Sequence, residues 1–288
     1  MPTSKPPEIN SGDLFAVFNM PPEEAIAYFE RKGIRVSWDW QEVWRHANTR
    51  AFTVAKTTRL DVVTDIYEAL RDDLKQGGTF PAFLAKLQPV LEAKGWWGKK
   101  QQVNRWTGEV RTVTYGTPWR LETIYETNLQ TAYMAGRYET MMAATMYAPW
   151  WEYSAVMDNR TRPQHAALNG QVFRYDDPFW QIWYPPNGFR CRCTVIARTD
   201  IEKQRGAFQV SSGEGRMEII SQSVKKADGS IAKVQITGYR SPITDKVLAP
   251  DMGWDYNPAV ANNKLQQIYN EKLQAAPEPI RKKALDND

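Results

Sequence analysis

Apolar residues recur at intervals of three and four along most of the N-terminal half of the chain. Leu60, Val63, Ile66 and Leu70 show this spacing clearly, and the glycines at 77–78 end the run. Such spacing gives a helix one apolar face. The predicted helices cover residues 21–29, 38–75 as a pair, 79–95 with Thr79 as the N-cap, and 117–149, where Pro149 ends the longest pattern in the chain.

Shorter apolar runs separated by turn-forming residues are typical of β-strands. Two such runs flank Thr107-Gly108 and predict a hairpin near residues 101–116, inserted between helices. After Pro149 turn-forming residues become frequent, and Asp228-Gly229 lies between two further runs, as in a hairpin. The strands predicted in this part cover residues 150–157, 171–175, 192–197, 216–222 and 232–237.

The order of these elements predicts an α+β fold, in which a helical N-terminal half is followed by a small, mainly antiparallel β domain. The predicted regions are a flexible N-terminal segment (1–20), a helical region with the inserted hairpin (21–148), an α+β region (149–258) and a C-terminal part (259–288). The last region is predicted to hold a lone amphipathic helix over 261–273 and a frayed tail.

Composition excludes a disordered chain. Twelve Trp, 13 Tyr and 10 Phe among 288 residues require a substantial core. With 37 Lys+Arg against 33 Asp+Glu, the net charge of +4 gives no electrostatic argument for binding nucleic acid or an anionic membrane. The sequence shows neither the apolar core of a signal peptide nor the ~20 apolar residues that span a bilayer, so we expect a cytosolic protein without a membrane partner.

The two cysteines, Cys191 and Cys193, are too close in sequence to form a disulfide of good geometry. With His165 they could supply three zinc ligands, and Asp158 or water could be the fourth. The single Cys-x-Cys pair is a weak signal, since structural zinc sites usually show two separated pairs of ligands. In the structural alternative, Cys191 and Cys193 are small buried residues on one side of a strand, and His165 occupies a hydrogen-bonded position in the core.

A catalytic role for these residues is less favoured than a structural one. Asp158 and His165 could form an acid/base pair, or Cys193 a nucleophile with His165 as its base. The chain carries no serine nucleophile elbow, Walker loop, dinucleotide-binding glycine pattern or HExxH motif. We therefore expect no enzymatic activity and no catalytic residues. Four arginines could bind phosphate or carboxylate groups, but pairing with acids nearby in the sequence is favoured; they are Arg160, Arg162, Arg190 and Arg192.

Large aromatic residues cluster in two parts of the chain, and core anchoring is their simplest role. Indole rings are also enriched at interface hot spots, which favours an interaction protein where catalytic motifs are lacking. The residues are Trp38, Trp40, Trp44, Trp150, Trp151, Phe179, Trp180, Trp183 and Tyr184.

Several sequence blocks in a fixed order resemble the phage Mu protein F family of minor head, or head morphogenesis, proteins. The blocks are GTPWRLETIYETNLQTAYMAGRYE (116–139), DNRTRPQHAALNGQVF (158–173), DDPFW (176–180), PPNGFRCRC (185–193) and DMGWDYNP (251–258). The resemblance covers about residues 95–258. The positions that match the family's shared motif are Asp158, Arg160, Thr161, Arg162, His165, Gly170, Pro186, Cys191, Arg192 and Cys193.

The resemblance implies a minor capsid protein of a tailed phage or prophage, which acts in head assembly near the portal by protein–protein interaction. It implies portal, capsid or scaffold proteins as partners, with DNA inside the head as a further contact. The expected location is the host cytoplasm during assembly, then the procapsid or virion. The alternative is a metal-dependent enzyme or DNA-contacting module centred on the motif.

A structural clamp is the favoured interpretation of the motif itself. Asp158 would accept hydrogen bonds from Arg160 or Arg192, and a turn at Pro186 would bring Cys191 near His165. Some relatives carry extra Cys or His residues near the first block, where this chain has Arg162 and other non-thiols, which weakens a zinc site. No cofactor is therefore expected, with zinc at His165, Cys191 and Cys193 as the alternative.

Overall fold

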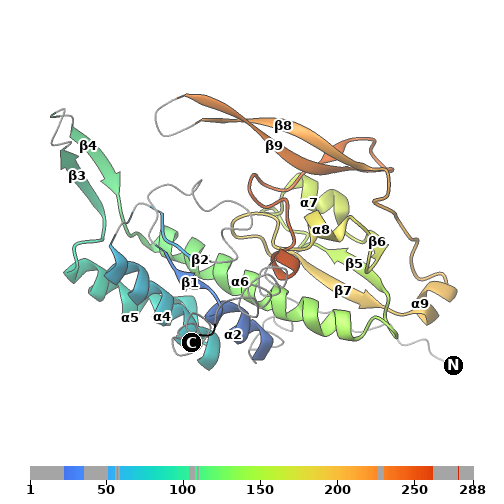
Figure 1. The fold of residues 1–288 in the computed structure, drawn as a ribbon, viewed down its shortest axis with the longest axis horizontal. Coiled ribbons are helices and arrows are strands. Elements are labelled where there is room, and N and C mark those ends of the chain that lie inside the picture. Colours follow the sequence, from blue (N-terminus) through green and yellow to red (C-terminus); the bar gives the residue numbers. More distant parts are fainter. Residues whose placement is uncertain are drawn as a thin grey trace.

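The computed structural model describes residues 23–35, 51–55, 57, 59–103, 108, 110–225, 230–261 and 278. Its helices are α2 (Glu23–Glu30), α4 (Leu60–Gln76), α5 (Phe80–Ala93), α6 (Pro118–Ala143), α7 (Pro163–Leu168), α8 (Trp180–Trp183) and α9 (Asp200–Gln204). Its strands are β1 (Gly33–Ile34), β2 (Ala51–Phe52), β3 (Lys99–Val103), β4 (Val110–Thr114), β5 (Trp150–Ser154), β6 (Val172–Arg174), β7 (Thr194–Arg198), β8 (Met217–Lys225), β9 (Ile231–Arg240) and β10 (Val247–Leu248). Helices dominate the first half and antiparallel sheets the second, so the predicted α+β class is confirmed (Figure 1).

The N-terminal core packs α2, α4 and α5 against α6. The apolar positions that predicted the helices are buried in this core, among them Val63, Ile66 and Leu70 of α4. α2 crosses α6 closely, because a Cβ atom at Gly136 would lie 2.9 Å from the backbone nitrogen of Ala25. Glycine at this position therefore sets the distance between the two helices.

The prediction of two helices over residues 38–75 is wrong at its centre. Ala51 and Phe52 form strand β2, which pairs in parallel with Gly33 and Ile34 of β1. Phe52 is buried and packs against Phe29 of α2, with a ring-centroid distance of 6.0 Å. Burial of this ring together with strand pairing outweighs helix propensity. Residues 38–50, with Trp38, Trp40 and Trp44, lie outside the described part of the chain, as does the predicted helix over 261–273 apart from its first residue.

The long helix α6 begins as predicted and ends earlier. The Thr117 hydroxyl accepts a hydrogen bond from the Arg120 amide at 3.2 Å, and a proline occupies the first turn. The helix ends at Ala143, six residues before Pro149. Beyond that point Met146 and Tyr147 are 86% and 78% exposed, so no core contact supports another helical turn.

The second half is built around a three-stranded antiparallel sheet with β5 at its centre, between β6 and β7. Its core is rich in aromatic rings and also receives Met134 and Met141 from α6. Trp151, Phe179, Trp180, Trp183 and Tyr184 are buried there, which confirms their predicted role as core anchors. Trp150 differs: it is only half-buried, and its indole donates to Asp200 at 2.6 Å.

Two hairpins extend from the body of the protein (Figure 1). The predicted hairpin near 101–116 is formed by β3 and β4, which pair from Lys99–Thr114 to Val103–Val110. The second predicted hairpin is the long ribbon of β8 and β9, with β10 added at its base. Within the described residues, every helix is too short or too polar to cross a bilayer.

Lys32 is a buried ammonium in the helical half. Burial lowers the pKa of Lys32 to about 8, from an ordinary value of 10.5. The unfolded chain therefore holds this proton more tightly, and stability rises as the pH increases from about 8 to 10.5. We expect Lys32→Met to raise the free energy of unfolding at pH 7 by roughly 3 kcal/mol and to flatten this rise. Urea denaturation across pH 7–11 measures both effects, and an unchanged slope in the variant would contradict them.

A buried histidine–cysteine cluster braced by ion pairs

The motif residues come from two segments that lie together in the structure. The first is the turn at 158–162 with helix α7, which follows β5, and the second is the loop at 185–193, which leads into β7. Thr161 belongs to the turn, where its hydroxyl donates to the Val156 carbonyl. Pro186 follows a cis peptide bond in the loop, and Gly170 has a φ of +77° just after α7. All ten motif positions thus lie in or beside these two segments.

Asp158 joins the two segments through Arg192. Both carboxylate oxygens accept from the Arg192 guanidinium at 2.7 Å, a bidentate geometry. Asp158 also accepts from the backbone amide of Arg160 at 3.0 Å, and the Arg160 side chain lies farther away at 3.8 Å. The Arg192 hydrogen bonds hold the pKa of Asp158 well below its usual range.

Arg162 forms a second connection between the segments. Its guanidinium donates to the Phe189 carbonyl at 2.9 Å and pairs with the Asp251 carboxylate at 2.7 Å. Burial raises the pKa of Asp251, and the nearby charge of Arg162 opposes this shift. Arg190 pairs instead with α6, through Glu122 at 2.8 Å and Glu126 at 2.7 Å. The four arginines are therefore paired within the chain, as predicted, although most of their partners are distant in sequence.

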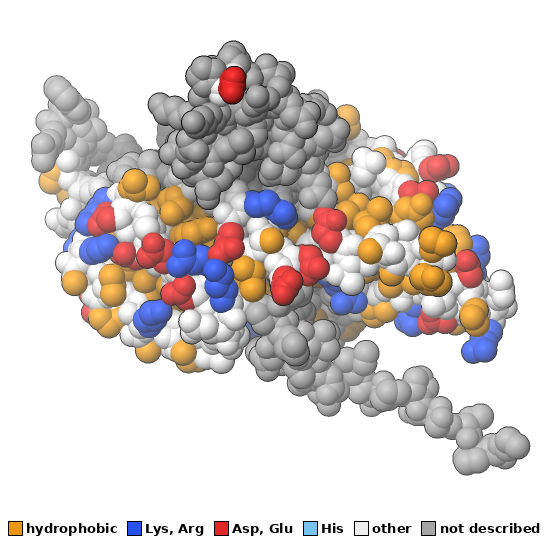
Figure 2. All heavy atoms as spheres, turned by 60° about the horizontal axis from the view of Figure 1, so that its bottom comes forward, with side chains coloured by type: hydrophobic (Ala, Val, Ile, Leu, Met, Phe, Trp, Pro, Cys, Tyr) orange, Lys and Arg blue, Asp and Glu red, His pale blue; other side chains and the backbone are white. Residues whose placement is uncertain are grey.

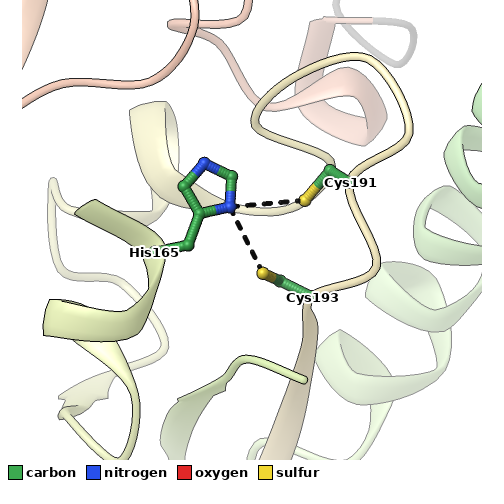
Figure 3. Close-up of side chains that lie close together, drawn as sticks. All are labelled: His165, Cys191 and Cys193. Carbon is green, nitrogen blue, oxygen red and sulfur yellow. Dashed lines mark hydrogen bonds between the residues drawn. The ribbon is translucent and has the colours of Figure 1, made fainter. Parts of the chain in front are cut away.

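His165, Cys191 and Cys193 meet inside this frame. The Nδ1 atom of His165 on α7 lies 3.4 Å from the Cys193 sulfur and 3.7 Å from the Cys191 sulfur (Figure 3). The three ligand-type atoms all lie within 4.8 Å of one another. The exposed fractions of the three residues are only 2–4%. The imidazole faces the edge of Trp183, at a ring-centroid distance of 5.7 Å.

The pKa values of the two thiols shift in opposite directions. A hydrogen bond from the Cys193 thiol lowers the pKa of Cys191, and His165 acts in the same direction. The same hydrogen bond, together with burial, raises the pKa of Cys193. Cys191 is therefore the sulfur with thiolate character.

Asn187 and Asp251 support the loop that carries the cysteines. Asn187 is fully buried, and its Oδ1 accepts from the Tyr153 hydroxyl of β5 at 3.0 Å. Its Nδ2 donates to the carbonyls of Ile182 and Tyr184 at 3.3 and 3.4 Å. The backbone carbonyl of Asn187 accepts from the Asp251 amide at 3.0 Å. These bonds fix the loop relative to the central sheet.

Sequence reasoning missed these supporting residues. Asp251 and Asn187 both lie in blocks quoted for the resemblance, but an Asp-x-Gly or Pro-Asn-Gly stretch is typical of an ordinary turn. The signal available was their presence in the blocks that carry the resemblance and, for Asn187, its place in the block that also holds both cysteines.

The geometry assembles only one of the two catalytic pairs considered above, Cys193 with His165, and buries it. The Asp158 carboxylate is occupied by Arg192 and does not belong to the His165 cluster. Cys193 and His165 are close enough to exchange a proton, but they are 3% and 2% exposed, which leaves a substrate no access. The arrangement can brace two segments, and its nitrogen and sulfur atoms can bind a metal.

The fold and the site together describe the class of protein: an α+β protein whose second half contains a buried His–Cys cluster next to a bidentate Asp–Arg ion pair. Residues 64–196 match the sequence model of the family described as "Phage Mu protein F like protein". The chain belongs to this family, which confirms the resemblance seen in the sequence.

Two relatives extend the match. "Putative capsid assembly protein F" of Escherichia phage Mu is 42% identical over 263 residues, which are 91% of this chain and 59% of the relative. "Mu-like prophage FluMu F protein" of Haemophilus influenzae is 36% identical over 248 residues, 83% of this chain and 59% of the relative. The chain thus spans about three fifths of the length of these relatives. No solved structure matches significantly.

Proposed function

We propose that this chain acts in head assembly of a tailed phage or prophage, as a minor capsid protein near the portal that works through protein–protein contacts. The observation that carries this proposal is the 42% identity, over 91% of the chain, to a protein named as a capsid assembly protein. The partners we propose are the portal, capsid or scaffold proteins of the same head.

The motif supports a structural role rather than a reaction. Its most reactive side chains are buried, and its partly exposed charges form ion pairs within the chain, Asp158 with Arg192 and Arg162 with Asp251. Such pairing positions the segments that carry these residues and leaves the charged groups of the motif engaged within the chain.

The ribbon of β8 and β9 is the surface that best fits a head-protein partner. It extends from the body of the protein and exposes Ile219 and Ile231 by 70% and 74% (Figure 1). Two-stranded ribbons are only marginally stable alone in water, so packing against another protein would stabilise this one. Apolar residues on such a ribbon are suited to a protein partner.

Electrostatics gives little support to DNA binding as the main role. Basic and acidic side chains are interspersed over the described part of the face in Figure 2. Proteins that bind the phosphate backbone instead gather Lys and Arg on one face. DNA within the head is therefore a secondary contact in this proposal.

The test is quantitative mass spectrometry of purified heads, made by co-expressing the source element's head genes with and without this gene. We expect a few copies of the chain per head and defective particles in its absence. The double variant Ile219→Asp/Ile231→Asp should fold normally and be depleted from heads, whereas Ile201→Asp, at an exposed position on α9, should be incorporated. Normal particles without the gene, and heads that lack the chain, would contradict the proposal.

A further inference from the structure

We propose that His165, Cys191 and Cys193 bind one zinc ion, which cross-links α7, the 185–193 loop and the start of β7. The three residues converge from separate segments, and the imidazole nitrogen faces both sulfurs (Figure 3). The role we assign to the ion is structural.

The distances match those that tetrahedral zinc requires. Zinc binds imidazole nitrogen at about 2.0 Å and thiolate sulfur at about 2.3 Å, so tetrahedral angles place nitrogen and sulfur about 3.5 Å apart. In the structure the His165 Nδ1 atom lies 3.4 Å from one sulfur and 3.7 Å from the other. One ion therefore fits among the three atoms with little rearrangement.

Hydrogen bonding alone is a poor reason to bury this cluster. Thiols are weak donors and acceptors, so His165 gains little from its two sulfur neighbours. Its Nε2 atom is also buried and has no hydrogen-bond partner among the described residues. Burial of an unsatisfied polar atom costs about 1–3 kcal/mol, which coordination of the other nitrogen would offset.

The donor set selects the metal. Two sulfurs and one imidazole form a soft, tetrahedral environment that favours zinc over magnesium or calcium, which prefer oxygen ligands. Water would complete the tetrahedron, because the Asp251 carboxylate is paired with Arg162 and lies outside the three-residue cluster.

The ion would join segments that are also connected by partly exposed polar contacts. The Asp158–Arg192 ion pair crosses between them, and Arg162, which donates to the Phe189 carbonyl, also pairs with Asp251; the side chains of both ion pairs are about one third exposed. Exposed pairs of this kind contribute about 0–1 kcal/mol each. A buried ion between the same segments would hold them far more firmly.

The first test uses the full-length protein, purified without chelators from cells grown with added zinc. We expect about one zinc per chain by elemental analysis, and a melting temperature that falls when a strong chelator is added. Cobalt substitution should give the visible absorption of tetrahedral Co²⁺ with a sulfur-to-metal charge-transfer band. A folded protein that holds less than a tenth of an equivalent of zinc and ignores the chelator would overturn the proposal.

The second test identifies the ligands. Cys191→Ser, Cys193→Ser and His165→Asn should each lose stoichiometric zinc and the chelator-dependent shift. Leu168→Ala is the matched control, because Leu168 is fully buried on the same helix and belongs to the same core. It should lower the melting temperature and keep the metal. Retention of one zinc by all three ligand variants would overturn the assignment.

Discussion

Replacing Phe179 with alanine is expected to lower the free energy of unfolding by about 4 kcal/mol. Phe179 is completely buried and stacks on Phe173, with ring centroids 3.8 Å apart and planes 9° from parallel. It also meets Trp180 and Tyr239 edge to face at 5.0 and 5.1 Å. Alanine would remove the ring from the centre of this aromatic core and leave a cavity that large, interlocked neighbours cannot close.

Urea denaturation followed by tryptophan fluorescence measures this loss. Tyr147→Ala is the control, since Tyr147 is 78% exposed and its truncation should change stability by less than about 0.5 kcal/mol. A loss of under about 1 kcal/mol for Phe179→Ala would show that this core is not packed as described.

Replacing Asn187 with alanine is expected to cost a similar amount, again about 4 kcal/mol, for a different reason. The substitution removes three hydrogen bonds, two of them buried and one partly buried, and leaves the Tyr153 hydroxyl and two carbonyls without this partner. Each unsatisfied buried group costs about 1–3 kcal/mol. Asn187→Asp would keep the acceptor for Tyr153 and still lose both donated bonds, so it should also destabilise.

A double-mutant cycle with Tyr153→Phe isolates the side-chain pair. The double variant should be less destabilised than the sum of the single variants by about 1 kcal/mol, because both substitutions remove one shared bond. Strict additivity would mean that the hydroxyl–amide contact contributes nothing to folding. The same cycle followed by proteolysis of the 185–193 loop would show whether Asn187 also holds the loop in place.

Helices were predictable where apolar spacing was regular and a stop signal was present. The run from Leu60 ends at Gly77, which adopts a φ of +70° in the structure, and the next helix begins directly after Thr79. The hairpins were likewise marked by glycine turns between short apolar runs. In these segments local pattern and tertiary packing favour the same conformation.

Prediction failed where tertiary contacts decide. Strand β2 is two residues long, and its pairing with the distant strand β1 and the contacts of the Phe52 ring with Phe29 and Tyr67 favour the strand. The end of α6 at Ala143 depends on the loss of core contacts rather than on Pro149. Neither the strand pairing of β2 nor the end of α6 can be predicted from the local spacing of apolar residues.

The candidate site was predictable in its membership, in the Asp158–Arg192 pair and in the approach of Cys191 to His165, but not in its other pairings. Sequence blocks brought out His165 and both cysteines, because these residue types are rare in the chain. Acids near in sequence were expected to pair with the arginines, yet Arg162 pairs with Asp251 and Arg190 with Glu122 and Glu126. Long-range ion pairs leave no periodic signal, since they depend on which loops the fold brings together.

Helix α6 contributes to both hydrophobic cores, through Leu121 and Tyr125 in the first and Met134 and Met141 in the second. One continuous helix, rather than a linker, therefore connects the helical half to the sheet. A mechanical force applied to either half would be transmitted along the axis of this helix. Because a helix bends sharply only where its backbone hydrogen bonds are disrupted, the two halves cannot rotate independently without such a break in α6, and a force on one half also acts on the other.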